Sequence, residues 1–293
     1  MVSLRETSCR ESPHNFLLPV ETDTLVVNIM SAAPRLRDGE QQVFFKAGGD
    51  WCYLWTPKSF KAGKPTAVVI HHHGNRGYVK EDTADWLEED RKTAFLKAVM
   101  SNNVAIAGSH ACGNHWGNPC SVEANGALLD ALAASPHVDP KRVGLMGGGL
   151  GGLLIWNSVL GPMMGRVKQA AVMQAVSSIE SIIRDHKFKD QQLVAYGLPP
   201  DMPDDEAVER LAASDPLPRL RRLRKGVPLP KTAIYHGAVD DNVLPDANAV
   251  ALADALRSAG AEVKLDLFPG VGHNTYGMGK EMEDRLKAFF STL

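Results

Sequence analysis

Short, continuous apolar runs alternate with segments of helical periodicity from about residue 65 to the end of the chain. A continuous apolar run is typical of a strand that is buried on both faces. Apolar residues three and four positions apart indicate a helix with one buried face. The predicted strands are 66–74, 104–110, 142–148, 169–176, 231–237 and 262–270, and the predicted helices are 84–103, 121–135, 150–161, 246–260 and 279–293.

This alternation predicts an α/β fold with a mostly parallel sheet, helices on both of its faces, and right-handed crossovers. Upstream, residues 24–30, 41–48 and 51–57 are rich in β-branched and aromatic side chains, with turn signals between them. We expect these segments to form antiparallel strands, after a weakly structured lead-in over residues 1–20. Sites in such sheets lie at the carboxyl ends of the strands.

The stretch 177–230 interrupts the alternation with a polar, proline-rich and partly helical sequence. It is too short to be an independent domain, so we expect a single domain over residues 1–293. Within that domain, 177–230 is predicted to form a cap or lid over the top edge of the sheet. A cap in that place would shape a pocket and set its specificity.

Composition and charge narrow the choice of partners and compartment. Of the 293 residues, 44% are hydrophobic and 23% are charged, and the formal net charge is −2. Such a balance argues against nucleic acid or an anionic membrane as the main partner. The charged start of the chain and the lack of a long apolar run predict a soluble, cytoplasmic protein. The four cysteines (Cys9, Cys52, Cys112 and Cys120) have no CxxC spacing, so we expect reduced thiols.

The segment RVGLMGGGLGGLLIW, residues 142–156, has the pattern of a strand, a sharp turn and a helix. A catalytic serine is expected between glycines at such a turn. Here Gly149 occupies the centre of the frame that runs from Gly147 to Gly151. The segment therefore has the form of a nucleophile-bearing turn without the nucleophile.

Two later strand ends carry an acid and a histidine, Asp240 in IYHGAVDDNVLP and His273 in LFPGVGHNTYG. Their chain order and their position after strands favour a His–Asp dyad over coincidence. Asp240 could instead form an ordinary Asx turn, and the neighbouring Asp241 is an alternative acid. The spacing to Val243 and Pro245 favours Asp240.

With these residues the chain resembles the α/β-hydrolase superfamily over roughly residues 40–293, and is most similar to its dienelactone-hydrolase and prolyl-oligopeptidase-like branches. Those families place nucleophile, acid and histidine in this chain order. The resemblance implies that Gly149 holds the nucleophile's place, Asp240 the acid's and His273 the base's. It also implies an oxyanion hole made by the backbone N–H groups of Asn75, in the turn after HHHG, and of Leu150.

The HHHG segment and the segment SHACGNHWGNPC supply further candidate residues. Strand alternation places His71 and His73 on one face and His72 on the other. A metal site needs converging ligands that the rest of the chain does not offer, so we expect no metal and no organic cofactor. We expect the pocket to be lined by His73, Cys112, His115 and Trp116.

Cys112 or Ser109 as a relocated nucleophile is the weaker alternative. Such a group would need a nearby base and would also have to face the oxyanion donors. A role in lining the pocket or in loop packing is therefore favoured for both residues.

Glycine at the centre of the turn preserves the backbone, because it adopts left-handed angles easily, but it excludes an acyl-enzyme through residue 149. Three hypotheses stay open. The first is a hydrolase-family enzyme for a small acyl compound (ester, lactone or amide) whose serine has been lost or replaced. The second is a lyase- or cyclase-type enzyme that uses His273, held by Asp240, as a general base. The third is a ligand-binding or scaffold protein; we favour an enzyme, and the resemblance is compatible with a homodimer.

Overall fold

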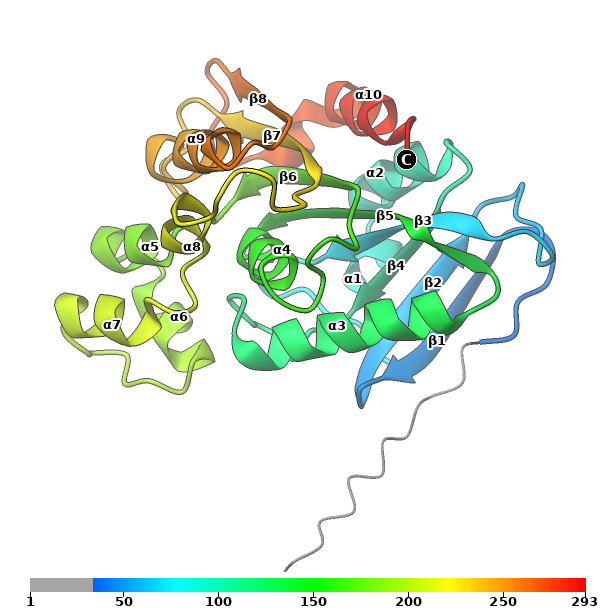
Figure 1. Ribbon diagram of the computed structural model, residues 1–293, viewed down its shortest axis with the longest axis horizontal. Coiled ribbons are helices and arrows are strands. Elements are labelled where there is room, and N and C mark those ends of the chain that lie inside the picture. Colours follow the sequence, from blue (N-terminus) through cyan, green and yellow to red (C-terminus); the bar gives the residue numbers. More distant parts are fainter. Residues whose placement is uncertain (1–33) are drawn as a thin grey trace, which may run out of the picture.

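A single eight-stranded sheet organises the computed structural model, which describes residues 34–293 (Figure 1). The strand order is β1-β2-β4-β3-β5-β6-β7-β8. The pairs β1–β2 and β2–β4 are antiparallel, and every later pair is parallel. The strands are β1 (Gln41–Ala47), β2 (Asp50–Thr56), β3 (Thr66–His72), β4 (Ala105–Ser109), β5 (Val138–Gly149), β6 (Gln169–Ala175), β7 (Lys231–Gly237) and β8 (Val263–Phe268).

The predicted α/β class and the mostly parallel sheet are therefore confirmed. The antiparallel pair predicted at 41–48 and 51–57 corresponds to β1 and β2. The strand predicted at 24–30 and the lead-in over 1–20 lie outside the described residues.

Helices cover both faces of the sheet, as the double-sided burial of its strands requires. One face carries α3 (Pro119–Ala134), α4 (Gly151–Val159) and α9 (Ala251–Ser258). The other carries α1 (Asp85–Glu88), α2 (Asp90–Met100) and α10 (Gly279–Phe290). No helix within residues 34–293 is both long and apolar enough to cross a membrane.

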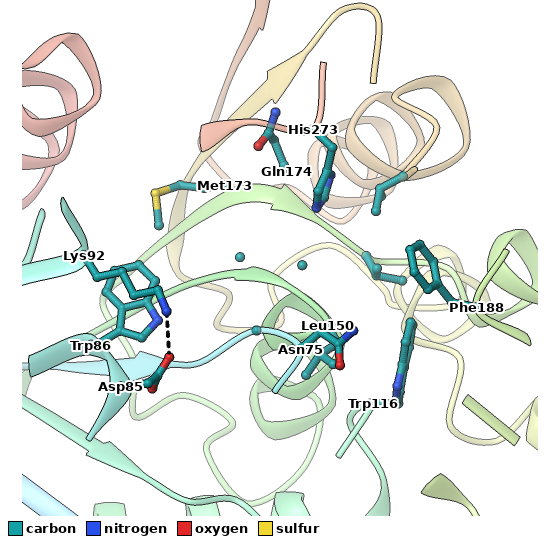
Figure 2. Close-up of a pocket in the computed structure, with 15 residues that line it drawn as sticks. Asn75, Asp85, Trp86, Lys92, Trp116, Leu150, Met173, Gln174, Phe188 and His273 are labelled. Atoms are coloured by element: carbon teal, nitrogen blue, oxygen red, sulfur yellow. Dashed lines mark hydrogen bonds and ion pairs between the residues drawn. The ribbon is translucent and has the colours of Figure 1, made fainter. Parts of the chain in front are cut away.

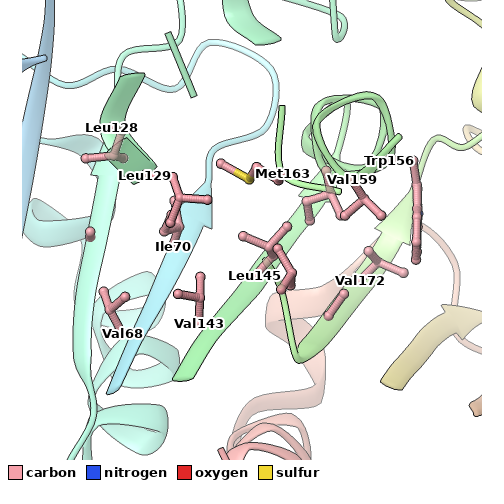
Figure 3. Packing of buried hydrophobic residues seen from close by; sticks show 14 of the residues in the cluster. Val68, Ile70, Leu128, Leu129, Val143, Leu145, Trp156, Val159, Met163 and Val172 are labelled. Atoms are coloured by element: carbon pink, nitrogen blue, oxygen red, sulfur yellow. The ribbon is translucent and has the colours of Figure 1, made fainter. Parts of the chain in front are cut away.

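The core on the α3 and α4 face shows how the apolar strands are used (Figure 3). Val68 and Ile70 of β3 lie beside Val143 and Leu145 of β5, and all four side chains are fully buried. Residues between them, such as Val69, point to the opposite face and join the core under α2 and α10. Burial on both faces explains why these strands read as unbroken apolar runs.

Between β6 and β7 the chain forms four short helices over the edge of the sheet (Figure 1). They are α5 (Ile179–Asp185), α6 (Lys189–Ala195), α7 (Asp204–Leu211) and α8 (Pro216–Arg221). Ile179, Ile183 and Leu193 from this insertion pack with Leu150 and Leu153 at the start of α4. The insertion therefore rests directly on the turn that follows β5.

The structure differs from the predicted helices at two places. The segment 84–103 forms two helices, because Glu89 takes an extended backbone conformation with φ −99° and ψ 117°. The break leaves Trp86 and Lys92 on different helices that both reach the pocket described below. The helix predicted at 246–260 begins with a π-helical turn, Asp246–Val250, before α9.

Replacement of Leu145 by alanine should destabilise the protein strongly. The side chain is fully buried on the central strand β5, and a Leu→Ala cavity in a core costs about 2–5 kcal/mol. Chemical denaturation measures the free energy of unfolding. The matched control is Leu244→Ala, since Leu244 is 41% exposed and its loss should cost under about 0.5 kcal/mol. Equal losses in the two variants would contradict this description of the core.

Candidate active site

The turn from β5 into α4 holds Gly149 in a left-handed conformation, with φ +53°. β5 ends at Gly149, and α4 begins at Gly151 after Leu150. The pairing of β5 with β6 shifts register between Gly148 and Gly149, so the chain leaves the sheet at this residue. A non-glycine residue at these angles would carry about 1–3 kcal/mol of strain, as expected of the sharp turn predicted from the sequence.

The glycines around Gly149 are required because other backbone segments approach them closely. A Cβ at Gly147 would lie 2.9 Å from the carbonyl oxygen of His72, and one at Gly151 would lie 2.8 Å from the same atom. A Cβ at Gly152 would lie 2.5 Å from the Cβ of Ala175. These contacts are too short for any side chain, so the three positions accept only glycine.

Gly149 differs from these glycines in having open space beside it. Apart from its neighbours in the chain, no atom that the structure describes lies within 4 Å of a Cβ placed on Gly149; the side chains of Thr275 and Tyr276 are not among the described atoms. The position that holds the nucleophile in the resembling families therefore has room for a side chain, although this sequence puts none there.

Asp240 and His273 meet at the carboxyl edge of the sheet. Asp240 follows β7, His273 follows β8, and the His273 Nδ1 lies 2.8 Å from the Asp240 Oδ2. The other carboxylate oxygen of Asp240 accepts hydrogen bonds from the backbone N–H groups of Asn242, at 3.0 Å, and Val243, at 2.9 Å. Asp241, the alternative acid, is exposed and ion-paired to Lys187. The structure thus brings Asp240, and not Asp241, to His273.

The carboxylate of Asp240 is held in its ionised form. Burial of the side chain opposes ionisation, but hydrogen bonds from His236 and His273 and from the Val243 N–H outweigh it, so the pKa of Asp240 lies below its ordinary value of 3.8. An ionised acceptor at Nδ1 fixes the proton of His273 on that nitrogen. The Nε2 atom of the neutral ring is then free of a proton and can act as a base.

His236 is a second histidine on the same carboxylate, and it was not among the residues predicted for the site. Its Nε2 lies 3.2 Å from the Asp240 Oδ2 and 2.8 Å from the carbonyl oxygen of Val243. A carbonyl only accepts hydrogen bonds, so this nitrogen carries a proton and donates it. The signal was available, because His236 lies near the end of β7, only four residues before Asp240.

A cavity of about 250 Å³ lies between these elements. Figure 2 shows His273 pointing into it, with Trp116 and Phe188 on one side and Asp85, Trp86 and Lys92 on the other. The lining residues are Gly74, Asn75, Asp85, Trp86, Lys92, Trp116, Gly148, Gly149, Leu150, Met173, Gln174, Val176, Phe188, Val243 and His273. Of the residues predicted for the site, the structure brings Asn75, Gly149, Leu150, Trp116 and His273 to one cavity, with Asp240 behind His273.

Three residues predicted to line the pocket do not line it. His73 is buried beneath the turn at Gly74, where its ring nitrogens face backbone carbonyls. His115 is also fully buried, and its Nδ1 accepts a hydrogen bond from the N–H of Gly117. Cys112 is exposed on the loop after β4. A position just after a strand end does not by itself place a side chain in the cavity. The loop between β4 and α3, for example, turns most of its side chains away from the cavity.

The prediction of reduced thiols is wrong for Cys112 and Cys120, which form a disulfide across the loop between β4 and α3. Cys112 therefore has no thiol to act as a nucleophile, and Ser109, the other alternative, is buried within β4. Cys52 is free, and burial raises the pKa of its thiol to about 12. Cys9 lies outside the described residues.

Other lining residues could not be found from motifs. Phe188 comes from the insertion, and Met173 comes from the end of β6. Asp85 and Lys92 pair at 3.1 Å at one end of the cavity, and Lys92 also pairs with Glu89 at 3.0 Å. A Lys and two acids on an amphipathic helix look like solvated surface, and only the break at Glu89 turns them toward the cavity.

The sheet, its two helical layers and the acid–histidine pair at its carboxyl edge define an α/β hydrolase. The chain belongs to the prolyl oligopeptidase family, whose model matches residues 109–292. It is 32% identical over 179 residues to a protein of Bacillus subtilis strain 168 named "Uncharacterized peptidase YuxL". That match covers 57% of this chain but 25% of the relative, so the chain spans about a quarter of the relative's length.

Solved structures share the fold at low identity. Oligopeptidase B from Leishmania major has a TM-score of 0.67 at 15% identity, over 87% of this chain and 37% of the other. A mutant of the esterase E40 has a TM-score of 0.58 at 16% identity, over 87% of this chain and 85% of the other. The fold therefore occurs both in larger peptidases and in an esterase of similar length.

Replacement of Asp240 by asparagine should make stability less dependent on acid pH. Because the pKa of Asp240 is depressed in the folded state, its ionised form stabilises the fold above about pH 4, and this contribution is lost as the pH falls further. The difference in free energy of unfolding between the native chain and Asp240→Asn should therefore be largest at neutral pH and shrink toward pH 3. Asp241→Asn, an exposed neighbour, is the control and should show no such trend. A difference for Asp240→Asn that is constant with pH would refute the assignment.

Proposed function

We propose that this protein carries a hydrolase-type site for a small acyl compound (an ester, lactone or amide), in which the covalent nucleophile is absent because Gly149 holds its place. The observation that carries the proposal is the open space at Gly149, on a left-handed turn that lines the same cavity as His273. The flanking positions accept only glycine because other backbone segments approach them closely, whereas a Cβ at Gly149 would meet open space. The site thus has every part of a serine-hydrolase turn except the hydroxyl.

The backbone N–H groups of Asn75 and Leu150 are proposed as the oxyanion donors. Both residues line the cavity, on the turn after β3 and at the start of α4. Backbone donors do not depend on the side chain at position 149, so they survive its loss. In a serine hydrolase stripped of its triad, such donors and substrate binding alone retain roughly 10³–10⁴-fold acceleration over water.

The substrate class rests on the relatives. The family is that of prolyl oligopeptidase, the curated relative is named a peptidase, and one structural neighbour is an esterase. Peptidases and esterases both cleave a bond to an acyl carbon. The cavity of about 250 Å³ suits a small compound, and its aromatic wall of Trp116 and Phe188 suits an apolar group on it.

A second candidate function uses the dyad without any covalent step. His273 is oriented by Asp240, so that its Nε2 is the basic nitrogen and faces the cavity. It could take a proton from water or from the substrate, while the proposed donors stabilise the resulting oxyanion. Direct hydrolysis, elimination, cyclisation or retro-aldol cleavage are the reactions that this arrangement supports.

Replacement of Gly149 by serine should create esterase activity. The space at this position admits the side chain, and the new hydroxyl would lie in the cavity that His273 faces. We expect hydrolysis of p-nitrophenyl acetate to rise by at least about 10²-fold over the native chain, with covalent labelling by a fluorophosphonate probe. Gly149→Ala is the matched control, since it fills the same space at the same backbone strain without a hydroxyl. A folded Gly149→Ser protein that neither hydrolyses the ester nor reacts with the fluorophosphonate probe would contradict the proposal.

Replacement of His273 by alanine distinguishes the second candidate. If the dyad works as a general base, the native chain turns over a suitable substrate and His273→Ala loses about 10²–10⁴-fold of that rate. Assays of proton exchange and of lactone hydrolysis on the native chain measure it. A native chain that binds acyl compounds equally well with and without the His273 imidazole, and turns over none, would favour a ligand-binding protein instead.

A further inference from the structure

Gln174, near the end of β6, has a backbone conformation that is unusual for its residue type. Its φ of +46° lies in the left-handed region, where a side chain is strained, and the residue is 4% exposed. Gly148 of β5 pairs with Met173 of β6, and Gly149 pairs with Ala175, so Gln174 is the extra residue of a β-bulge. A bulge re-aims the side chain that it carries, so the backbone of β6 sets the direction of the Gln174 amide.

The Gln174 side chain reaches the loop that carries His273 (Figure 2). Its Nε2 donates a hydrogen bond to the carbonyl oxygen of Gly272, the residue before His273. The backbone N–H of Asn274 donates to the same oxygen at 2.8 Å, so two donors hold this carbonyl. Gln174 also lines the cavity together with Gly149 and His273. The amide therefore connects two parts of the site that belong to different strands.

The loop after β8 has to cross the end of β7 to meet Gln174, because β7 lies between β6 and β8 in the sheet. Gly237, the last residue of β7, makes this crossing possible. A Cβ there would lie 2.2 Å from the carbonyl oxygen of Val271 and 2.5 Å from that of Gly272. The N–H of Val239 donates to the Val271 carbonyl at 3.1 Å. The loop thus rests on bare backbone at the end of β7 and meets an amide side chain from β6.

We infer that Gln174 is a positioning residue whose amide fixes the Gly272–His273 peptide and so holds the His273 imidazole in the cavity. The carbonyl of Gly272 and the N–H of His273 belong to one planar peptide unit, so holding the carbonyl fixes the bond that leads to the His273 Cα. Asp240 restrains the same residue from its other end, through the ring Nδ1 at 2.8 Å. That this link serves chemistry rests on the proposed function, whereas that it holds the imidazole does not.

The hydrogen bond to Asp240 does not by itself fix the imidazole of His273. A third of the His273 side chain is exposed, and Gly270 and Gly272 allow the backbone before it many conformations. A ring held only at Nδ1 can rotate about that hydrogen bond and direct its Nε2 away from the cavity. A misplacement of about 1 Å in a reacting group can cost about 10²-fold in rate. The second restraint, on the backbone, removes this freedom.

The bulge also relates His273 to the turn at Gly149. One step beyond the bulge, the N–H of Val176 donates to the carbonyl oxygen of Gly149 at 2.8 Å. Two left-handed residues, Gly149 and Gln174, therefore lie where β5 and β6 shift register. The spacing between position 149 and the imidazole is thus set through β6 as well as through Asp240 after β7.

Proton NMR of the native chain tests whether Gln174 holds the imidazole. The proton between the His273 Nδ1 and Asp240 should give a resolved downfield signal, assigned by its loss in His273→Ala. Gln174→Met keeps the length of the side chain without a donor. In this variant the signal should broaden or disappear, because the ring moves and its proton exchanges with water. A sharp, unchanged signal in Gln174→Met overturns the inference, and so does a native chain that shows no such signal.

Gln169→Met is the matched control. Gln169 is also 4% exposed and lies at the start of β6, where its Nε2 donates to the carbonyl oxygen of Phe289 and to the hydroxyl of Thr292. Its loss should lower the unfolding temperature and leave the His273 signal unchanged. A signal that is lost equally in the Gln169 and Gln174 variants contradicts a specific role for Gln174.

Gln174→Gly separates positioning from stability, and it serves in place of Gln174→Met if that variant does not fold. Glycine relaxes the left-handed backbone, so this variant should unfold at no lower a temperature than the native chain. It should still lose the His273 signal, because it has no amide. A Gln174→Gly protein that unfolds at a lower temperature but keeps the signal would assign Gln174 to stability alone and overturn the inference.

Kinetics in the Gly149→Ser background test the role in chemistry. Gln174→Met and Gln174→Gly should each lower kcat for p-nitrophenyl acetate by about tenfold or more, with KM within about twofold, because the imidazole is misplaced. Gln169→Met should keep kcat within about twofold of the parent. An unchanged kcat in both Gln174 variants overturns the role in chemistry. An inactive Gly149→Ser parent contradicts the proposed function instead, and the NMR signal then decides alone whether Gln174 holds the imidazole.

Discussion

The close approach of the end of β3 to the turn after β5 is the constraint on which the whole site depends. The carbonyl oxygen of His72 lies so near Gly147 and Gly151 that neither position can carry a Cβ. This contact fixes where β5 ends and α4 begins, and so puts Gly149 on its left-handed turn. It also sets the turn at Gly74 against the start of α4, so that Asn75 and Leu150 share a cavity. Backbone packing, and not a catalytic side chain, therefore keeps the shape of the site.

At the ends of β7 and β8, the ionisable groups are arranged around the buried carboxylate of Asp240. Asp240 accepts hydrogen bonds from two imidazoles and two backbone N–H groups, which together overcome the cost of burying its charge. His236 is held by the backbone as well, through the Val243 carbonyl, so it stabilises the acid without reaching the cavity. His273 is the partner that faces the cavity, with a third of its side chain exposed. Of Asp240, His236 and His273, it is therefore His273 that is placed to exchange protons with a ligand in the cavity.

Much of the fold was predictable because parallel strands buried on both faces leave a plain apolar signal, and β7 begins and ends at the predicted residues. Chain order and strand ends likewise located Asp240, His273 and Gly149. The predictions that failed share a physical cause, because each depended on the path of a loop. Nothing in the spacing of Cys112 and Cys120 fixed their approach to a Cα distance of 6.3 Å, and the facing of His115 followed from the path of the same loop. The break at Glu89, which brings Lys92 to the cavity, has no marker such as proline or glycine.

The empty space beside Gly149 has a genetic consequence. Glycine and serine codons include pairs that differ by a single base, and a Cβ at position 149 would meet no described atom within 4 Å outside its neighbours in the chain. A lineage can therefore lose or regain a hydroxyl here in one mutational step, without passing through an unfolded intermediate sequence. A site whose shape is set by backbone contacts can regain a hydroxyl in this way for as long as the flanking glycines are retained.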